Sequence, residues 1–196
     1  MHMSNEYDGQ ATATPPLVEW TTRIEQLTGL DRLVGLVRPF ADGLVAVPAR
    51  RDLLRGRWVG HALHPVLTDL PIGFWTSANV LDLVGGRQSR PAARRLVALG
   101  LLSALPTAAT GLAEWAGTGE REQRVGVVHA GANTVALGLY TASWRARRNH
   151  RHGRGVLLGL AGSAAVSVGG YLGGHLAAAR KVSSRHPAFE EPETTW

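Results

Sequence analysis

The 25 residues Gly155–Ala179, GVLLGLAGSAAVSVGGYLGGHLAAA, contain no Asp, Glu, Lys or Arg. At 1.5 Å per residue, a helix of this length is long enough to cross about 30 Å of hydrocarbon. A helix on the surface of a water-soluble protein carries charged side chains on its outer face, and this stretch carries none. The segment therefore predicts a helix whose outer surface faces lipid.

Two further stretches show the same pattern, and a third shows it in part. Leu96–Ala113 has 18 residues without Asp, Glu, Lys or Arg, and Val125–Trp144 has 20. Val66–Gly86 is apolar apart from Asp69 and Asp82. Together with Gly155–Ala179, these stretches predict an all-α, integral membrane protein with four crossings. The linkers between them are short, which favours an up-down-up-down four-helix bundle.

The two acidic residues of the first crossing differ in their expected positions. Asp82 lies near one end of the apolar stretch, so we expect its carboxylate to reach the lipid headgroups. Asp69 lies further in, where an ionised carboxylate costs about 2.5–3.5 kcal/mol unless it is paired or neutral. This helix is therefore expected to depend on its neighbours for insertion.

The chain before the first crossing follows a different pattern. Apolar residues recur there at helical spacing, while the other positions carry charge, which is typical of amphipathic helices at a membrane surface or against a bundle. The predicted organisation is a disordered tail at 1–16, an amphipathic helical arm at 17–56, a four-helix transmembrane domain at 57–180 and a C-terminal tail at 181–196. The recurring apolar residues of the arm are Leu17, Trp20, Ile24 and Leu27, followed by Leu33, Val37, Phe40 and Leu44.

Composition excludes several chemistries. The chain has no cysteine, so it cannot form disulfides, thiolate metal sites or a cysteine-ligated iron–sulfur cluster. The net charge is +6, but the arginines flank apolar stretches and no nucleic-acid recognition motif accompanies them, so nucleic-acid binding is not indicated. No catalytic residues are assigned, because no serine has a general-base partner in its sequence context and no phosphate loop or dinucleotide fingerprint is present.

The histidines of the apolar stretches are expected at one depth. When the four helices are threaded antiparallel, His64, His129 and His175 all fall within about two helical turns of the membrane face that holds both chain termini. His61 and His64 share a helix face if the first helix begins before Pro65. Asn133 lies one turn from His129 on the same face.

This arrangement suggests a haem site. Membrane cytochromes hold haem iron between histidines on facing helices, and small residues on those helices make room for the macrocycle. We hypothesise that haem b is bound by His129 and His175, with His64 as the next candidate ligand. Two other interpretations remain open: a cofactor-free scaffold whose histidines stabilise helix packing, and a proton or metal pathway formed by His61, His64, Asp69 and Glu114.

The stretch WVGHALHPVLTDLPIGFW at Trp58–Trp75 resembles a bacterial membrane family called domain of unknown function 2231. The hallmark of that family is Gly-His-x-Leu-His-Pro followed by Pro-Ile-Gly, which here begin at Gly60 and Pro71. The resemblance covers about 57–176, and its later parts are similar to the actinobacterial branch, at Pro106–Trp115, Val128–Thr134 and Gly169–Leu176.

The resemblance implies a multi-pass protein of the bacterial cytoplasmic membrane. In that branch the membrane part is often followed by a Rieske iron–sulfur domain, which implies a redox setting. This chain has no cysteine, so the resemblance implies a separate iron–sulfur protein as the partner for any electron transfer. The family has no assigned activity that could be carried over to individual residues.

Overall fold

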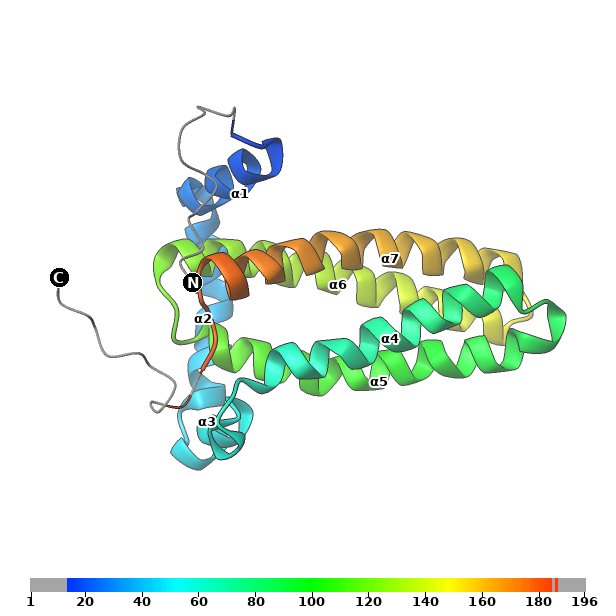
Figure 1. Cartoon of the computed structure of the whole chain (residues 1–196), viewed down its shortest axis with the longest axis horizontal. Helices are drawn as coiled ribbons and strands as arrows, with labels where there is room; N and C mark the ends of the chain where they lie inside the picture. Colours follow the sequence, from blue (N-terminus) through cyan, green and yellow to red (C-terminus); the bar gives the residue numbers. More distant parts are fainter. Residues whose placement is uncertain (1–13, 185, 187–196) are drawn as a thin grey trace, which may run out of the picture.

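The structure is a computed structural model that describes residues 14–184 and 186. The described chain is helical and contains no β-strand (Figure 1). Residues 1–13, 185 and 187–196, which include most of both predicted tails, lie outside the described residues. The long helices are α4 (Leu63–Val84), α5 (Arg90–Trp115), α6 (Glu120–Arg148) and α7 (His152–Gly174). The shorter elements are α1 (Pro16–Gln26), η1 (Thr28–Leu30), α2 (Asp31–Val45), α3 (Pro48–Leu54), η2 (Arg57–Val59), η3 (Arg87–Ser89) and η4 (His175–Ala179).

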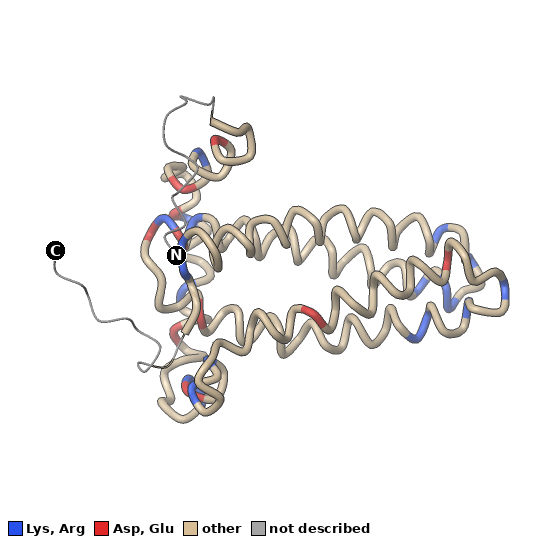
Figure 2. Tube along the Cα trace, viewed as in Figure 1, with Lys and Arg blue, Asp and Glu red and all other residues tan. Residues whose placement is uncertain are grey.

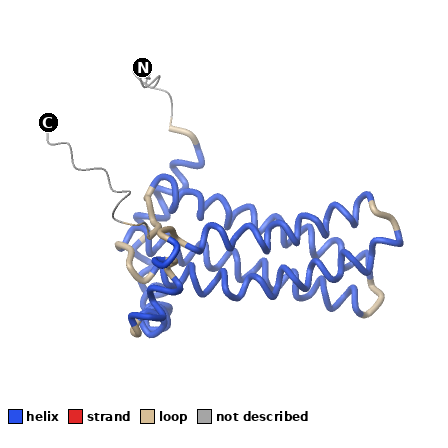
Figure 3. Tube along the Cα trace, turned by 60° about the horizontal axis from the view of Figure 1, so that its bottom comes forward, coloured by secondary structure: helices blue, strands red, loops and turns tan. Residues whose placement is uncertain are grey.

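The four long helices form two antiparallel hairpins that lie side by side. Helix α4 packs along α5, and α6 packs along α7 (Figure 1), while contacts between the hairpins are fewer; Figure 3 shows the four long helices alongside one another from a second direction. Tight connections enforce this topology: α5 starts six residues after α4 ends, and α6 and α7 are separated by 149–151 alone. The predicted up-down-up-down order of four helices is therefore present, and η4 extends α7 as one turn of π-helix.

Two stretches of the described chain are long and apolar enough to cross a membrane, at 87–115 and 152–179. They contain α5 and α7, so the structure supports two of the four predicted crossings by this criterion. Helices α4 and α6 are less apolar because they carry polar side chains between their ends, among them Asp69, His129 and Asn133. Most charged residues lie near the two ends of the bundle, and the shafts between them are largely free of charge (Figure 2).

The arm forms a collar across one end of the bundle. Helices α1, α2 and α3 run roughly across the long axis of the four-helix part, at the end where α5 meets α6 (Figure 1). Pro16 occupies the first turn of α1 and Pro48 the first turn of α3, where a missing amide hydrogen costs nothing. The predicted arm at 17–56 is thus helical, and it is folded onto the bundle.

An aromatic stack joins the two hairpins near the middle of the bundle. Trp75 of α4 and Tyr140 of α6 have ring centroids 4.1 Å apart and planes inclined by only 9°. The Trp75 indole donates a hydrogen bond to the Val97 carbonyl at 3.3 Å, and it lies where a Cβ on Gly100 would stand. Gly162 of α7 makes the same kind of room for the Tyr140 ring. Small residues therefore allow the helix backbones to approach two large rings.

The sequence predicts that Asp82 reaches the lipid headgroups. In the structure its carboxylate is instead paired inside the bundle. Its side chain is 1% exposed, and both of its oxygens accept hydrogen bonds from the Arg147 guanidinium at 2.8 and 2.5 Å. Arg147 lies beyond the predicted crossing Val125–Trp144, but α6 continues to Arg148 and this guanidinium binds inside the bundle. The ion pair fastens α4 to α6 at the end of the bundle opposite the collar.

Removing one partner of this ion pair should destabilise the bundle. In the Arg147→Met variant the buried Asp82 carboxylate loses its counter-charge, which typically costs about 3–5 kcal/mol. The measurement is the free energy of unfolding in detergent micelles. The control is Arg23→Gln, which breaks the exposed pair with Glu19 and should leave that free energy unchanged. Equal stability of the Arg147→Met and wild-type proteins would contradict a structural role for the pair.

Candidate functional site

His64 lies in the first turn of α4 and is directed at α5. Its Nδ1 atom lies 2.9 Å from the Thr107 carbonyl oxygen. A carbonyl can only accept, so this Nδ1 carries the proton and Nε2 of the neutral ring keeps its lone pair. Gly111, one turn further along α5, borders the ring so closely that an added Cβ would stand 2.6 Å from Cε1. Thr107 and Gly111 thus form the wall that receives this imidazole.

His129 repeats the arrangement in the second hairpin. It lies in α6, and its Nδ1 atom donates to the Gly169 carbonyl of α7 at 2.8 Å. Its Nε2 atom accepts a hydrogen bond from Asn133 Nδ2 at 3.1 Å. Gly173 borders the ring, and a Cβ at that position would lie 3.1 Å from Cε1. Each hairpin therefore presents one imidazole, anchored through Nδ1 to a backbone carbonyl of its own second helix.

The two imidazoles meet between the hairpins. The ring centroids of His64 and His129 are 6.3 Å apart, and the ring planes are inclined by 82°. This contact confirms the predicted shared depth for these two histidines. The bond to a carbonyl fixes the ring tautomer and its orientation, and the same bond raises the basicity of the other nitrogen toward a metal. The pair can therefore hold an electrophilic metal centre, or it can serve as a satisfied polar contact.

His175, the other predicted haem ligand, is engaged elsewhere. It lies in η4, and its Nε2 atom is 2.7 Å from Glu25 Oε1 of the arm. Arg180 also binds Glu25, donating to both carboxylate oxygens. The structure therefore brings His129 together with His64, and it places His175 in a contact that holds α1 against the end of α7.

The predicted metal ligands do not converge. Within 14–184 and 186, no three His, Cys, Asp or Glu side chains are grouped so that they could hold a metal ion. Helix α4 begins at Leu63, two residues after His61, so the predicted shared helix face of His61 and His64 is not formed. Asp69 lies on the exposed side of α4. Glu114 accepts hydrogen bonds from the Ser184 amide and hydroxyl at 3.0 and 2.9 Å.

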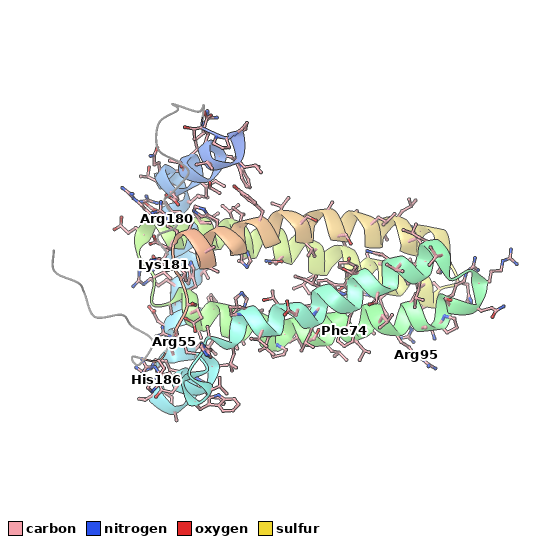
Figure 4. All side chains as sticks on the ribbon, in the orientation of Figure 1. Arg55, Phe74, Arg95, Arg180, Lys181 and His186 are labelled. Atoms are coloured by element: carbon pink, nitrogen blue, oxygen red, sulfur yellow. The ribbon has the colours of Figure 1, made fainter. Side chains whose placement is uncertain are left out.

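A cleft of about 320 Å³ opens beside Glu114 at the collar end. Arg55, Arg180 and Lys181 contribute positive charge to its wall, and Figure 4 shows these three side chains at that end, with Arg95 toward the other end. Part of the Arg55 guanidinium is already hydrogen-bonded within the protein, because its Nε donates to the Ala113 carbonyl at 2.9 Å. The collar end is thus rich in charge immediately next to the histidine pair.

Sequence reasoning did not identify Glu25, Thr107 or Gly111 as part of the site. Glu25 is the acidic residue on the bundle-facing side of α1, which only the docking of the arm reveals. Thr107 and Gly111 are four residues apart in a helix, a spacing that signals close packing but not its partner. Asn133 was placed on the face of His129 by spacing alone, and its hydrogen bond to the ring agrees with that placement.

Comparison with known proteins places the chain in a family. The model of a family described as "Predicted membrane protein (DUF2231)" matches residues 60–186. The chain belongs to this family. The match begins at the Gly60 motif and includes all four helices of the bundle as well as η4. No curated protein and no solved structure matches the chain.

Membership in a predicted membrane protein family agrees with the apolar shafts of the bundle. The family has no assigned function, so the roles of its histidines follow from the geometry of this chain. Both His64 and His129 lie within the matched region, and the arm at 17–56 lies outside it. The resemblance stated from the Trp58–Trp75 motif is therefore confirmed.

A side chain at Gly111 should displace the His64 ring. In Gly111→Ala the added Cβ would stand 2.6 Å from Cε1, so the imidazole or the α5 backbone must move. Overpacking of this kind costs about 1–3 kcal/mol, measured as the free energy of unfolding in detergent. Gly131→Ala is the matched control, because it is also helical and a Cβ there meets nothing within 4 Å. A Gly111→Ala protein as stable as Gly131→Ala would refute this packing.

Docking of the arm should weaken in acid. Burial alone would raise the pKa of Glu25, but hydrogen bonds and positive charge from Arg180 and His175 outweigh it and hold that pKa below its ordinary value. The stabilisation is therefore complete above the unfolded pKa of about 4.3, and it is lost as the pH falls through the lower folded pKa. The hydrogen bond from Arg124 lowers the pKa of Asp31, also on the arm, so this carboxylate acts in the same direction.

The measurement is the hydrogen-exchange protection factor of α1 amides between pH 6 and pH 3. Protection should be high at pH 6 and should fall below about pH 4. The Glu25→Gln variant should show reduced protection already at pH 6 and a smaller decrease toward pH 3. Protection that stays constant over this range in the wild-type protein would exclude the Glu25 contacts as the clamp.

Proposed function

We propose that this chain is a haem-binding module of the bacterial cytoplasmic membrane, with α4–α7 crossing the bilayer and His64 and His129 as the axial ligands. The observation that carries the proposal is the meeting of these two imidazoles between the hairpins. The proposal keeps the predicted haem b and the predicted ligand His129. It replaces His175 by His64, because His175 is bound to Glu25.

The separation of the rings fits a shared metal ion. An imidazole nitrogen ligates a first-row metal at about 2 Å, so two rings on opposite sides of one ion have centroids about 6 Å apart. The observed separation is 6.3 Å.

The surroundings of the rings also favour a ligand role. Both Nδ1 atoms are bound to carbonyls, so Nε2 is the nitrogen through which each ring would ligate iron. In metal sites, ligating histidines commonly make this kind of second hydrogen bond. Haem, when bound, supplies one-electron redox chemistry whose potential depends on the axial ligands, their hydrogen bonds and burial. The chain itself orients the two rings through their hydrogen bonds to the Thr107 and Gly169 carbonyls.

One contact favours the cofactor-free scaffold instead. Asn133 Nδ2 donates to Nε2 of His129, so this ring already has partners for both nitrogens. Under the haem proposal, the hydrogen bond from Asn133 to Nε2 of His129 must break so that this nitrogen can bind iron. The Asn133 amide would keep its other hydrogen bond, to the His129 carbonyl at 3.0 Å. Under the scaffold alternative the two histidines simply satisfy polar atoms and join helices.

A redox role would also need a partner protein. With no cysteine, the chain cannot hold an iron–sulfur cluster of its own. We therefore propose a separate Rieske-type iron–sulfur protein as electron donor or acceptor, docking at the charged collar end that lies nearest to the histidine pair. The lipid bilayer is the other partner of the proposal.

The direct test is the visible absorption spectrum of protein purified in detergent after expression with haem supplied. We expect a Soret band whose intensity corresponds to about one haem per chain. The band should be lost in His64→Ala and in His129→Ala, because each variant lacks one of the two iron ligands. His175→Ala and His150→Ala should retain the band. His150 lies in the loop between α6 and α7, so it controls for loss of a histidine as such.

Each outcome separates the hypotheses. A wild-type protein without a Soret band would exclude haem binding and favour the cofactor-free scaffold. A stoichiometric metal ion in the absence of haem would indicate the metal pathway. A band that is lost in His129→Ala and His175→Ala but retained in His64→Ala would support His129 and His175, the pair predicted from the sequence, as the haem ligands. Correct folding of each variant is checked by its helical circular dichroism and its elution volume.

A further inference from the structure

Helix α2 of the collar has three different flanks. Val34, Val37 and Ala41 face the bundle, where they pack with Trp115 and Val127. Leu33, Leu36 and Phe40 form a second flank at the spacing i, i+3, i+7, and they are 50%, 67% and 74% exposed. Asp31, Arg38 and Asp42 form a third flank, which lies about opposite to the second at 3.6 residues per turn.

The contacts of α2 show which way these flanks point. The charged flank reaches the first turn of α6: Asp31 binds Arg124 at 2.7 Å, and Arg38 donates to Gln123 at 3.3 Å. The bundle-facing flank meets Val127, one turn further along α6. The flank of Leu33, Leu36 and Phe40 is therefore directed toward the middle of the bundle, and the charged flank toward its end.

Helix α1 shows the same polarity independently. On its end-facing side Glu25 binds Arg180, where the chain leaves the bundle. On its other side the Trp20 ring lies 6.1 Å from Tyr171, which is more than two turns deeper along the last helix. Leu27 lies on the same side of α1 as Trp20 and is 54% exposed. Two separate helices thus turn apolar side chains toward the shafts and charge toward the end.

We propose that this collar is embedded in the membrane surface, with the flank of Leu33, Leu36 and Phe40 inserted among the acyl chains of the bilayer that surrounds the bundle. Lipid fits this flank because its side chains continue the apolar outer surface of the shafts, where α4 and α5 also expose Val66, Leu102 and Leu105. The charged flank then lies among the headgroups and water. Helices that lie in the interface have this distribution of side chains.

The inference goes beyond haem binding and rests only on the part of the proposed function that places α4–α7 across the bilayer. If it holds, the hydrocarbon boundary at this end of the bundle lies at α2, so that Gln123 and Arg124 are in the headgroup layer and Val127 is at the edge of the hydrocarbon. His129, two residues further along α6, then lies just inside that edge. The collar would set the depth of the bundle in the bilayer, because moving it either way exposes apolar side chains or buries charged ones.

The absence of cysteine makes a site-specific test possible. Single cysteines are introduced by Leu36→Cys and Phe40→Cys on the apolar flank and by Asp42→Cys on the charged flank, all exposed positions of α2. Each full-length protein is labelled with a polarity-sensitive nitrobenzoxadiazole dye and reconstituted in phosphatidylcholine–phosphatidylglycerol nanodiscs. Quenching is measured with brominated lipid, which acts from the acyl chains, and with iodide, which acts from water. Leu33→Cys replaces either apolar-flank variant that fails to fold.

Labels at 36 and 40 should emit at shorter wavelength than the label at 42, and brominated lipid should quench them at least about twofold more strongly. The label at 42 should respond mainly to iodide. Equal iodide quenching at all three positions would overturn the proposal, because the flank would then lie in water. Shielding of 36 and 40 from both quenchers would also overturn it, because a second copy of the chain would then cover the flank.

Discussion

Polar side chains on otherwise apolar helices must find partners on neighbouring helices, and this requirement organises the bundle. Along shafts that lie in lipid, as proposed above, no water replaces a missing hydrogen bond, so each polar group is bound by another helix or costs free energy. His64 is bound by the Thr107 carbonyl, His129 by the Gly169 carbonyl, and Asp82 by Arg147. The polar residues within α4 and α6 are thus largely residues that hold the helices together. Asp69, exposed on α4, departs from this pattern.

The two ends of the bundle use different chemistry for this purpose. At the end opposite the collar, a fully buried ion pair ties α4 to α6, and His152 Nε2 lies 3.5 Å from the same carboxylate. At the collar end, two imidazoles meet, and both are anchored through Nδ1 to backbone carbonyls, while Nε2 of His129 accepts a hydrogen bond from Asn133. The collar adds Glu25 and Asp31 at this end, where they bind Arg180 and Arg124 of the bundle. This asymmetry assigns the proposed function to one end and a structural role to the other.

The sequence predicts the four helices and their order, because stretches without charge and short linkers leave few alternatives. It predicts the depth of His64 and His129 for the same reason, since depth follows from counting residues along each helix. It does not predict which histidines meet, because that depends on the rotation of each helix about its axis. Helical spacing gives only weak information on rotation where a helix is apolar on all sides, as in α7. The same limit explains Asp82: its position near a helix end suggested headgroups, while its rotation directs it at Arg147.

The most direct test of the account is the electron paramagnetic resonance spectrum of the oxidised, haem-loaded protein in nanodiscs. Imidazole ligands from both His64 and His129 should give a low-spin ferric signal, and removal of either histidine should abolish that signal together with the bound haem. His175→Ala should keep the low-spin signal, since that ring binds Glu25. A high-spin wild-type spectrum, or a low-spin spectrum that survives His64→Ala, would contradict the assignment of this histidine pair.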